Sequence, residues 1–366
     1  MSNELFISSQ DISLKQAMEL IEKNSRGILF LVDDAGILTG CVSDGDIRRW
    51  LLKTGNLEAG VMDAACNAPA FLYKENVSGY KEFMKSKRIH AVPILDDKNA
   101  VIHVKFDEDY YELSDVRKRA CLHDQEVIIM AGGKGTRLYP YTKILPKPLI
   151  PIGDKPILER IMDKFYDYGV SQFYLTVNYK KEMIKSYFSE VQKSCGIHFI
   201  EEDTPLGTAG SIAFIDHCFM DTVIVTNCDI LIEADYGEML KFHRSSNNLI
   251  TVVAALKNVV IPYGVLHTKE EGLIDSIEEK PCKSYLINTG LYFVEPKCLD
   301  SIPYGSFYHM TDLAKKAMSE GKKVGVYPIA EEDFLDMGQL EELKKMEERI
   351  NSGRTGWKDD EDRLFW

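Results

Sequence analysis

From residue 126 onward, short apolar runs alternate along the chain with amphipathic stretches. The apolar runs are typical of strands that are buried on both faces. The stretches between them repeat an apolar position every three to four residues, as Ile157, Ile161 and Phe165 do, and so predict helices. The predicted strands are residues 126–130, 173–177 and 222–226, and the predicted helices are residues 156–168 and 182–193.

Together these elements predict an α/β domain with a mostly parallel sheet that is covered by helices on both faces. Gly169 follows the first predicted helix and is a residue type that commonly ends one. Ligands of such sheets bind at the carboxyl ends of the strands. We therefore expect functional residues directly after the predicted strands.

The first 120 residues contain an internal repeat. The sequence LVDD at residues 31–34 recurs as ILDD at residues 94–97, which is an offset of 63 residues. Each copy follows a helical pattern, at residues 14–23 and 77–87, and precedes an apolar strand. We therefore predict a repeat unit over residues 1–120, with copies at about 1–58 and 59–120.

The rest of the chain divides into a second domain over residues 121–350 and a C-terminal tail over residues 351–366. Residues 108–121 are polar and charged, and we expect them to carry the linker between the two halves. The tail is polar and acidic but ends in Leu364, Phe365 and Trp366. Docking of these side chains on the body and docking on a partner subunit both remain open.

Composition adds several exclusions. Of the 366 residues, 45% are hydrophobic and 28% are charged, which is ordinary for a soluble globular protein. No apolar run approaches a membrane span, and the N-terminus lacks a secretory signal pattern. The eight cysteines stand apart in the sequence, which favours reduced thiols and a cytoplasmic location.

The net charge of −13 argues against nucleic acid as a partner. It also means that an anionic substrate must be held by a local cluster of basic side chains. The basic residues of this cluster, all close to one glycine-rich segment, are Lys134, Arg137, Lys143, Lys147 and Lys155.

That segment reads MAGGKGTRL at residues 130–138 and is followed by LPKPL at residues 145–149. Glycine lets the backbone approach a ligand closely, and the N–H groups of such a loop can hold phosphate oxygens. Arg137 and Lys147 would add positive charge, so the segment indicates a nucleoside triphosphate site. A Walker loop is excluded because Thr136 follows Gly135, and a dinucleotide fingerprint is excluded because Leu138 stands where its third glycine belongs.

The compound motif resembles the signature of the sugar-1-phosphate nucleotidyltransferases, GGxGTRL followed by PKPLxPI, over residues 132–152. The resemblance implies a nucleotide-binding fold similar to that of the GT-A-like glycosyltransferases. It also implies that a sugar 1-phosphate attacks the α-phosphorus of a nucleoside triphosphate, with Arg137 and Lys147 as catalytic residues. The nucleotide-binding residues that it implies are Met130, Ala131, Gly132, Gly133, Gly135, Thr136, Glu202, Gly207, Thr208 and Ala209. The last three belong to residues 206–211, where LGTAGS predicts a glycine-rich helix start.

Nucleotidyl transfer brings two anions together, so positioning, basic side chains and a divalent metal should carry it. Mg²⁺ prefers carboxylates and substrate phosphate oxygens. Asp229 follows the predicted strand at residues 222–226, and Asp336 lies in a short run between a strand and a helix. The matching positions hold the metal in the resembled family. We interpret Cys228, where many members have glycine, as a small buried side chain rather than a nucleophile.

Three further segments match the family, at residues 263–265, 278–281 and 288–292. The resemblance implies that the backbone at Gly264 lies close to the sugar. It places Glu279 on sugar hydroxyls and Lys280 on the 1-phosphate. Asn288 and Thr289 would contact the hexose.

Residues 36–51 resemble the end of a CBS motif, a βαββα module that usually occurs in tandem. The family often binds adenine nucleotides or related effectors between its two repeats, with an aspartate such as Asp46 on a ribose. The second copy is poorer, since residues 104–107 read VKFD where residues 43–46 read SDGD. An adenine or guanine nucleotide site and a purely structural or dimerising module both remain open.

We therefore expect an Mg²⁺-dependent enzyme that joins a nucleoside triphosphate and a sugar 1-phosphate to give an NDP-sugar and pyrophosphate. Its domain arrangement resembles the glucosamine-1-phosphate guanylyltransferases of legionaminate-type surface-sugar pathways, which points to GTP and glucosamine 1-phosphate. Mannose, heptose or glucose 1-phosphate and CTP or dTTP are the alternatives within this class. A CBS-based nucleotide sensor with an inactive transferase domain is the alternative from another class. We also expect a homo-oligomer and no membrane partner.

Overall fold

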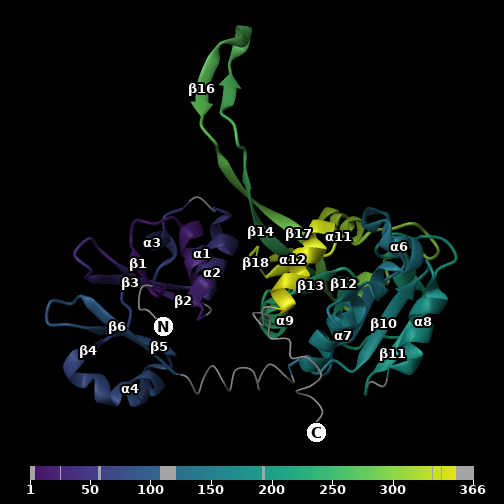
Figure 1. The fold of residues 1–366 in the computed structure, drawn as a ribbon, viewed down its shortest axis with the longest axis horizontal. Coiled ribbons are helices and arrows are strands. Elements are labelled where there is room, and N and C mark those ends of the chain that lie inside the picture. Colours follow the sequence, from purple (N-terminus) through teal and green to yellow (C-terminus); the bar gives the residue numbers. More distant parts are fainter. Residues whose placement is uncertain are drawn as a thin grey trace. The chain divides into compact units, whose positions relative to one another are not determined.

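The computed structural model describes residues 5–24, 26–56, 59–107, 121–191, 194–331, 333–338 and 340–351. The chain forms two compact units, Met1–Val116 and Arg117–Trp366, drawn in purple to blue and in teal to yellow in Figure 1. The predicted linker at residues 108–121 lies outside the described residues except for Cys121, and the predicted tail lies outside them except for Asn351. No helix of the described ranges has the length and apolar character needed to cross a membrane.

The first unit consists of two copies of one small sheet. Its elements are β1 Ile7–Ser9, α1 Leu14–Asn24, β2 Ile28–Val32, β3 Leu38–Ser43, α2 Asp44–Thr54, α3 Val61–Ala64, β4 Leu72–Tyr73, η2 Lys74–Gly79, α4 Tyr80–Lys87, β5 Ala91–Leu95 and β6 Val101–Phe106. In each copy the first strand is parallel to the second, which is antiparallel to the third. The strands β5 and β6 begin and end 63 residues after β2 and β3, which is the offset between the two copies in the sequence.

The two copies share a small apolar core. Phe6 and Phe30 of the first copy pack in one cluster with Ala91 and Val104 of the second. In this unit the structure also brings together two cysteines that stand apart in the sequence. Cys41 and Cys66 face each other across an antiparallel bridge, and both are free thiols.

The second unit is built on one seven-stranded sheet. Its elements up to the middle of the unit are β7 Val127–Met130, η3 Thr136–Leu138, α6 Tyr141–Ile144, η4 Lys147–Leu149, β8 Pro151–Ile152, β9 Lys155–Pro156, α7 Ile157–Asp167, β10 Gln172–Val177, α8 Lys181–Glu190, β11 Gly196–Glu201, η5 Gly210–Phe214, β12 Val223–Asn227, β13 Ile230–Ile232 and α9 Tyr236–Ser245. The remaining elements are β14 Ile250–Val260, β15 Val265–Thr268, η6 Glu270–Gly272, β16 Ile274–Glu278, β17 Cys282–Val294, α10 Pro296–Leu299, α11 Met310–Ser319, β18 Val324–Ile329, β19 Phe334–Asp336 and α12 Leu340–Asn351.

The order of this sheet is β11-β10-β7-β12-β17-β14-β18. Only β17 runs against its neighbours, so four of the six neighbouring pairs are parallel and the predicted mostly parallel sheet is confirmed. The predicted strands at residues 126–130, 173–177 and 222–226 are β7, β10 and β12. The predicted helices at residues 156–168 and 182–193 are α7 and α8, with ends that differ by up to three residues.

Each face of the sheet has its own core, as the alternation of side chains along a strand requires. Along β7, Val127 and Ile129 pack on one face with Phe165 of α7, whereas Ile128 and Met130 pack on the other. The second face is covered by α10 and α11 and the first by α7, α8, α9 and α12. Both cores leave the carboxyl ends of β7 and β12 at one edge of the sheet.

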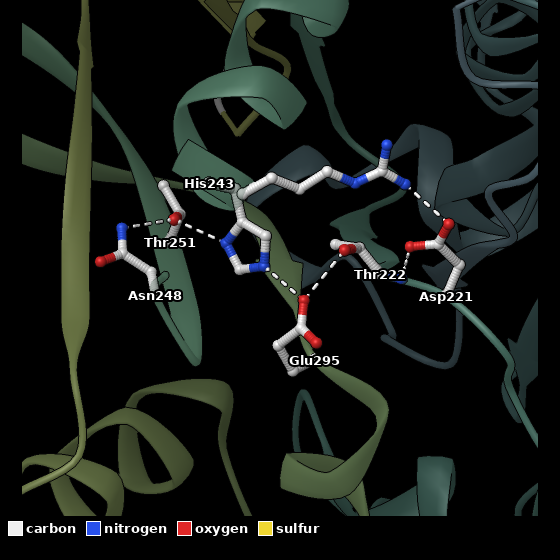
Figure 2. A network of polar contacts seen from close by, with 7 residues as sticks. Asp221, Thr222, His243, Asn248, Thr251 and Glu295 are labelled. Atoms are coloured by element: carbon white, nitrogen blue, oxygen red, sulfur yellow. Dashed lines mark hydrogen bonds and ion pairs between the residues drawn. The ribbon is translucent and has the colours of Figure 1, made fainter. Parts of the chain in front are cut away.

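A buried polar network lies at the opposite edge (Figure 2). His243 is fully buried, and its Nδ1 lies 2.8 Å from Thr251 Oγ1. Its Nε2 lies 3.0 Å from Oε1 of Glu295, which also accepts a hydrogen bond from the Thr222 hydroxyl. Thr222 directly precedes β12, and Glu295 directly follows the antiparallel β17. The network therefore ties the amino end of β12 to α9.

Candidate active site

A pocket of about 370 Å³ lies at the carboxyl ends of the strands β7 and β12. Such a volume is within the usual range of small-molecule sites. Its lining residues are Met130, Gly132, Gly133, Gly135, Thr136, Arg137, Leu138, Lys147, Thr176, Glu202, Pro205, Leu206, Gly207, Thr208, Asn227, Cys228, Asp229, Phe307 and Gly338. The pocket thus lies where the sequence predicted it, and it is lined by both predicted catalytic residues.

The glycine loop is shaped by its close neighbours. A side chain at Gly132 would lie 3.2 Å from the carboxylate of Glu202, a buried residue whose Oε2 accepts a hydrogen bond from the backbone of Leu206. Gly135 has a left-handed backbone, with φ at +63°, and a side chain there would lie 2.9 Å from Cβ of Lys147. Only glycine fits such a position without strain. The loop therefore packs directly on the stem of Lys147 and helps to fix its direction.

Lys147 and Asp229 form an ion pair inside the pocket. Nζ of Lys147 donates a hydrogen bond to Oδ2 of Asp229, and the two side chains are only 10% and 13% exposed. An ion pair with so little solvent around it is only weakly screened by salt. Asp229 follows β12, and Lys147 begins the short helix η4, so two separate elements bring the charges together.

Asp336 is positioned beside Asp229 by a short antiparallel pair of strands. In the pairing of β13 with β19, Asp336 lies opposite Ile230, and the backbone N–H of Met337 donates to the carbonyl of Asp229 at 2.8 Å. Burial and the nearby charge of Asp229 raise the pKa of the Asp336 carboxyl, although Lys147 and Arg137 act in the opposite direction. The two carboxylates therefore lie close enough to repel each other.

Arg137 completes this group of charges. A side chain at Gly338 would lie 3.0 Å from Oδ1 of Asp336 and 3.3 Å from the guanidinium of Arg137, so these two groups flank Gly338 on the pocket wall. Two cations and two carboxylates therefore meet at the point where the glycine loop ends.

The two aspartates fit a divalent metal that also binds substrate. Their mutual repulsion would be relieved by a cation between them. Within the described residues no group of three or more His, Cys, Asp and Glu side chains could hold a metal. A hard cation bound here would take its remaining ligands from water and phosphate oxygens, which is the pattern that Mg²⁺ prefers.

The prediction that residues 206–211 begin a helix is wrong. These residues make a turn that leads into the short 3-10 helix η5, because the turn is joined along its length to residues 306–309. The Ala209 N–H donates to the Tyr308 carbonyl, and the Tyr308 N–H donates to the Leu206 carbonyl, both at 2.9 Å. Gly207 and Thr208 line the pocket, whereas Ala209 is fully buried behind them.

Phe307 is a pocket residue that the sequence did not reveal. Its side chain is 64% exposed and lines the pocket on the side of Gly207 and Thr208. Residues 301–309 lie between two helices and carry no motif, so their place is set by the pairing with residues 206–210. An exposed aromatic ring in a pocket offers a flat apolar surface for stacking.

Several predicted residues lie outside the pocket lining. Ala131 is buried directly beneath the glycine loop. Asn288 Nδ2 donates to the hydroxyl of Tyr292, and the Thr289 hydroxyl donates to the carbonyl of Val253 in the neighbouring strand. These contacts leave both side chains engaged within the sheet.

The outer parts of β14 and β17 form a long ribbon that projects from the sheet and ends in the hairpin of β15 and β16 (Figure 1). Gly264 lies between β14 and β15, and Glu279 and Lys280 lie between β16 and β17. A side chain at Gly264 would lie 3.1 Å from Oε2 of Glu279, so these two positions face each other across the ribbon. The structure does not bring the three residues to the pocket. Their assignment to a sugar phosphate stays a prediction, as does that of Asn288 and Thr289.

The predicted basic cluster is smaller than expected. Arg137 and Lys147 line the pocket, but Lys155 forms an ion pair with Asp163 of α7 at 3.1 Å, outside the pocket lining. Cys228 is confirmed as a buried side chain, and burial together with the charge of Asp229 raises the pKa of its thiol to about 12. A thiol of that pKa is a poor nucleophile at neutral pH.

Asp46, the predicted effector residue, lies in the first turn of α2. Its carboxylate accepts hydrogen bonds from the backbone N–H and the hydroxyl of Ser43 and forms an ion pair with Arg49. Burial opposes ionisation, but these hydrogen bonds and the charge of Arg49 lower the pKa of Asp46 below its ordinary value. The carboxylate thus caps a helix, and its contact with a ribose stays a prediction.

Comparison with known families gives two matches. The profile of the family described as nucleotidyl transferase matches residues 126–353. The profile of the CBS domain matches residues 1–53, which lie within the first copy of the repeat. Each match falls in a different half of the chain.

Curated relatives match about half of this chain at about one-third identity. A UTP–glucose-1-phosphate uridylyltransferase from Synechocystis is 34% identical over 216 residues, covering 54% of this chain and 56% of the relative. A bifunctional protein GlmU from Methanococcus maripaludis is 35% identical over 212 residues, covering 55% of this chain and 49% of the relative. A probable mannose-1-phosphate guanylyltransferase 2 from Oryza sativa subsp. japonica is 32% identical over 187 residues, covering 48% of this chain and 52% of the relative. The chain spans about half the length of these relatives.

Among solved structures, the crystal structure of HddC from Yersinia pseudotuberculosis matches with a TM-score of 0.47 and 29% identity. The match covers 62% of this chain and 99% of that chain.

Proposed function

Since the chain belongs to the nucleotidyl transferase family and carries a CBS domain at its N-terminus, we propose that it transfers a nucleotidyl group from a nucleoside triphosphate to a sugar 1-phosphate. A phosphate oxygen of the sugar would attack the α-phosphorus, and the bond to the β-phosphate would break to release pyrophosphate. The observation that carries this proposal is the meeting of Arg137 and Lys147 with Asp229 and Asp336 at the end of the glycine loop.

In this reaction the backbone N–H groups of the loop around Gly133 would bind phosphate oxygens. The guanidinium of Arg137 and the ammonium of Lys147 would stabilise the charge that builds up as pyrophosphate leaves. The packing of Gly135 on its stem and the hydrogen bond to Asp229 already orient the side chain of Lys147. Little reorganisation is therefore needed when the substrate enters. Phe307 would stack on the base of the nucleotide, across the pocket from the phosphates.

Asp229 and Asp336 would hold a divalent metal, for which we propose Mg²⁺. When bound, such an ion neutralises phosphate charge and orients the triphosphate. Ligation of Asp229 would weaken the carboxylate's hold on Lys147, which would then be available to the phosphates. The ion pair of Lys147 with Asp229 would thereby couple metal binding to the positioning of the lysine.

For the substrates we propose GTP and glucosamine 1-phosphate. The support is the combination of a CBS unit with a nucleotidyl transferase domain. The relatives do not select the base, because their names include both uridylyl and guanylyl transfer. Mannose, heptose or glucose 1-phosphate and CTP or dTTP remain the alternatives. We also propose a cytoplasmic location, in keeping with the eight free cysteines.

The decisive experiment measures pyrophosphate release with Mg²⁺ for five nucleoside triphosphates, each combined with glucosamine, N-acetylglucosamine, mannose or glucose 1-phosphate. Turnover with one combination would establish both reaction and specificity. The substitution Lys147→Ala should abolish it. Lys155→Ala is a matched control, because it removes a lysine of similar exposure whose ion pair with Asp163 lies outside the pocket lining. Equal loss in both variants would contradict the assignment of Lys147.

For the repeat unit we propose that it binds an adenine or guanine nucleotide effector. The support is its two-copy build, in which both small sheets pack in one core. Titration calorimetry of the full chain with AMP and GMP, which cannot serve as triphosphate donors, would test it. The absence of heat together with normal turnover would leave the unit as a structural module. Binding without turnover over the whole substrate panel would favour the sensor alternative.

A further inference from the structure

Cys41 and Cys66 exchange two backbone hydrogen bonds at the edge of the sheet of β1, β2 and β3. The N–H of Cys41 donates to the carbonyl of Cys66 at 3.0 Å, and the N–H of Cys66 donates to the carbonyl of Cys41 at 2.8 Å. Antiparallel residues that exchange two such bonds are directly opposite each other, with Cα atoms about 5.5 Å apart. The Cα atoms of disulfides are usually about 4.4–6.8 Å apart. The backbone of this bridge therefore permits a disulfide.

The close approach of the two segments depends on Gly40. The strand β3 is at the edge of its sheet, and the segment with Cys66 lies along its open side. A side chain at Gly40 would lie 3.1 Å from the carbonyl oxygen of Cys66, so a larger residue there would crowd this segment. The two thiols are also in hydrogen-bond contact with each other. The fold thus holds two sulfur atoms side by side, although the cysteines are 25 positions apart in the sequence.

The core of the first unit does not require a thiol at position 41. Cys41 is opposite Phe30 in its sheet and is partly buried against the core that both copies share. At the equivalent place in the second copy, 63 residues later, Val104 is opposite Pro93 and packs in the same core. Since valine fills this place in one copy, packing alone does not explain a thiol in the other.

The two thiols differ in exposure, as a reacting cysteine and a resolving cysteine do. Cys66 is exposed, whereas Cys41 is partly buried. Burial raises the pKa of the Cys41 thiol to about 12, and the nearby Cys66 and Asp46 act in the same direction. An oxidant in solution therefore reaches Cys66 first, while Cys41 stays protonated beside it. Redox-sensing cysteines are typically accessible to solvent and often lie next to a resolving cysteine.

Glutathione disulfide is an oxidant that such a pair can use. The thiolate of Cys66 would attack one sulfur of glutathione disulfide, which releases one glutathione thiolate and leaves a mixed disulfide on Cys66. Cys41 would then attack the Cys66 sulfur as its own proton passes to the released thiolate. The second glutathione leaves, so two protein thiols and one glutathione disulfide give one protein disulfide and two molecules of glutathione.

The position of this bond makes it easy to reduce. The Cβ atoms of directly opposite residues are about 4.5–5.5 Å apart, with hydrogen-bonded pairs at the wide end of this range, whereas a disulfide prefers about 3.8 Å. A disulfide between Cys41 and Cys66 would therefore be strained, and strained or exposed disulfides are the labile ones. The segment between the two cysteines contains α2 and α3, with Asp46 in the first turn of α2. A closed disulfide would thus tie both helices to the edge of the sheet.

We propose that Cys41 and Cys66 form a reversible redox pair, which glutathione disulfide closes and glutathione reopens. Closure restrains α2, the helix that carries Asp46. Disulfides of cytoplasmic proteins are usually of this transient kind. The pair makes the first unit responsive to the thiol redox state, and it depends neither on the reaction nor on the effector proposed above.

The test equilibrates the full-length protein in buffers that range from glutathione to glutathione disulfide. Free thiols are then blocked, and the peptides are mapped by mass spectrometry. A linkage between Cys41 and Cys66 should form in the oxidised buffers, and an excess of glutathione should remove it. Cys41→Val, for which Val104 of the second copy is the precedent, should retain glutathione on Cys66. Cys218→Ser is the matched control, because it removes another exposed cysteine and should leave the linkage intact.

Hydrogen exchange of the wild type measures the effect of closure and requires no variant to fold. Amide exchange in α2 should slow at least about tenfold on oxidation, because the disulfide restricts the opened state of the segment that it encloses. The helix α4 of the second copy is the internal reference and should not change. Cys66→Ser should exchange alike in both buffers. Glutathione that stays on Cys66 of the wild type, a linkage to any other cysteine, or equal exchange of α2 in the oxidised and reduced protein would overturn the proposal.

Discussion

The ammonium of Lys147 is hydrogen-bonded to the carboxylate of Asp229, a residue 82 positions further along the chain. The pair lies at the junction of the glycine loop and β12, with Asp336 and Arg137 beside it. In the proposed reaction these two residues serve different partners, phosphate and metal. Their contact in the substrate-free chain means that each side chain holds the other in place. The ion pair therefore has a role in stability that can be measured separately from the role of each residue in the reaction.

Lys147→Met and Asp229→Leu should each lose stability and turnover. Removing one partner leaves a mostly buried charge, which costs about 3–5 kcal/mol, and loss of one transition-state contact lowers kcat by about 10²–10³-fold. The double variant should regain most of the stability, because no charge is left alone, but none of the turnover. Thermal unfolding and pyrophosphate release measure the two effects. A double variant as unstable as the sum of the singles would show that the ion pair is not the cause.

Asp336→Asn should raise the concentration of Mg²⁺ that gives half-maximal turnover by at least about tenfold. The substitution keeps the shape of the side chain but removes one of the two anionic ligands, and the remaining sites on the cation are weaker. Turnover is measured after chelation and stepwise return of Mg²⁺. Asp163→Asn is the matched control, because it removes another partly buried carboxylate, which pairs with Lys155 outside the pocket lining. An unchanged Mg²⁺ requirement in Asp336→Asn would remove this residue from the metal site.

Much of this site could be predicted because its chemistry lies in short motifs. The residues around Gly133 and Asp229 follow apolar strands directly, and the sheet order then brings both strand ends to one edge. The repeat in the first unit was equally accessible, since an offset of 63 residues is a property of the sequence itself.

Other features depend on contacts that no local pattern encodes. Phe307 reaches the pocket only because residues 306–309 pair with the turn around Gly207. The same pairing explains why the predicted helix start is a turn and a 3-10 helix. The ribbon between β14 and β17 was also hidden, because apolar positions such as Leu266 are compatible with a strand in any sheet and do not reveal that the ribbon projects from it.

Phe307→Ala should raise the KM for the nucleoside triphosphate by about tenfold, which corresponds to the loss of one base-stacking contact of about 1–3 kcal/mol. The kcat should change little, because the ring lies away from the charged end of the pocket. Tyr304→Ala is the control. Tyr304 is a similarly exposed aromatic three residues earlier, but its ring packs against Phe214 at 4.9 Å and is not among the pocket residues. Equal KM changes in both variants would argue that the loop, and not the ring, was disturbed.

Gly207→Ala should destabilise the second unit by at least about 2 kcal/mol. Gly207 has φ at +82°, and an added Cβ would lie 2.5 Å from the carbonyl oxygen of Tyr308, so the methyl group both strains the backbone and pushes apart two joined loops. Gly133→Ala is the control, since no atom lies within 4 Å of a Cβ at that position. Thermal unfolding should show a lower Tm only for Gly207→Ala. A normal Tm would mean that the two loops separate easily.

The buried His243 predicts how stability depends on pH (Figure 2). Burial lowers the pKa of its imidazole below the ordinary value of 6.5, although the carboxylate of Glu295 acts in the opposite direction. The folded state therefore keeps a neutral ring where the unfolded chain takes up a proton. The contribution to stability is complete above pH 6.5 and is lost progressively as pH falls below it. His243→Gln should flatten the fall of Tm between pH 7 and pH 5.5, whereas substitution of the exposed His123 by glutamine should leave it unchanged. Identical slopes in the wild type and His243→Gln would show that another group controls the acid sensitivity.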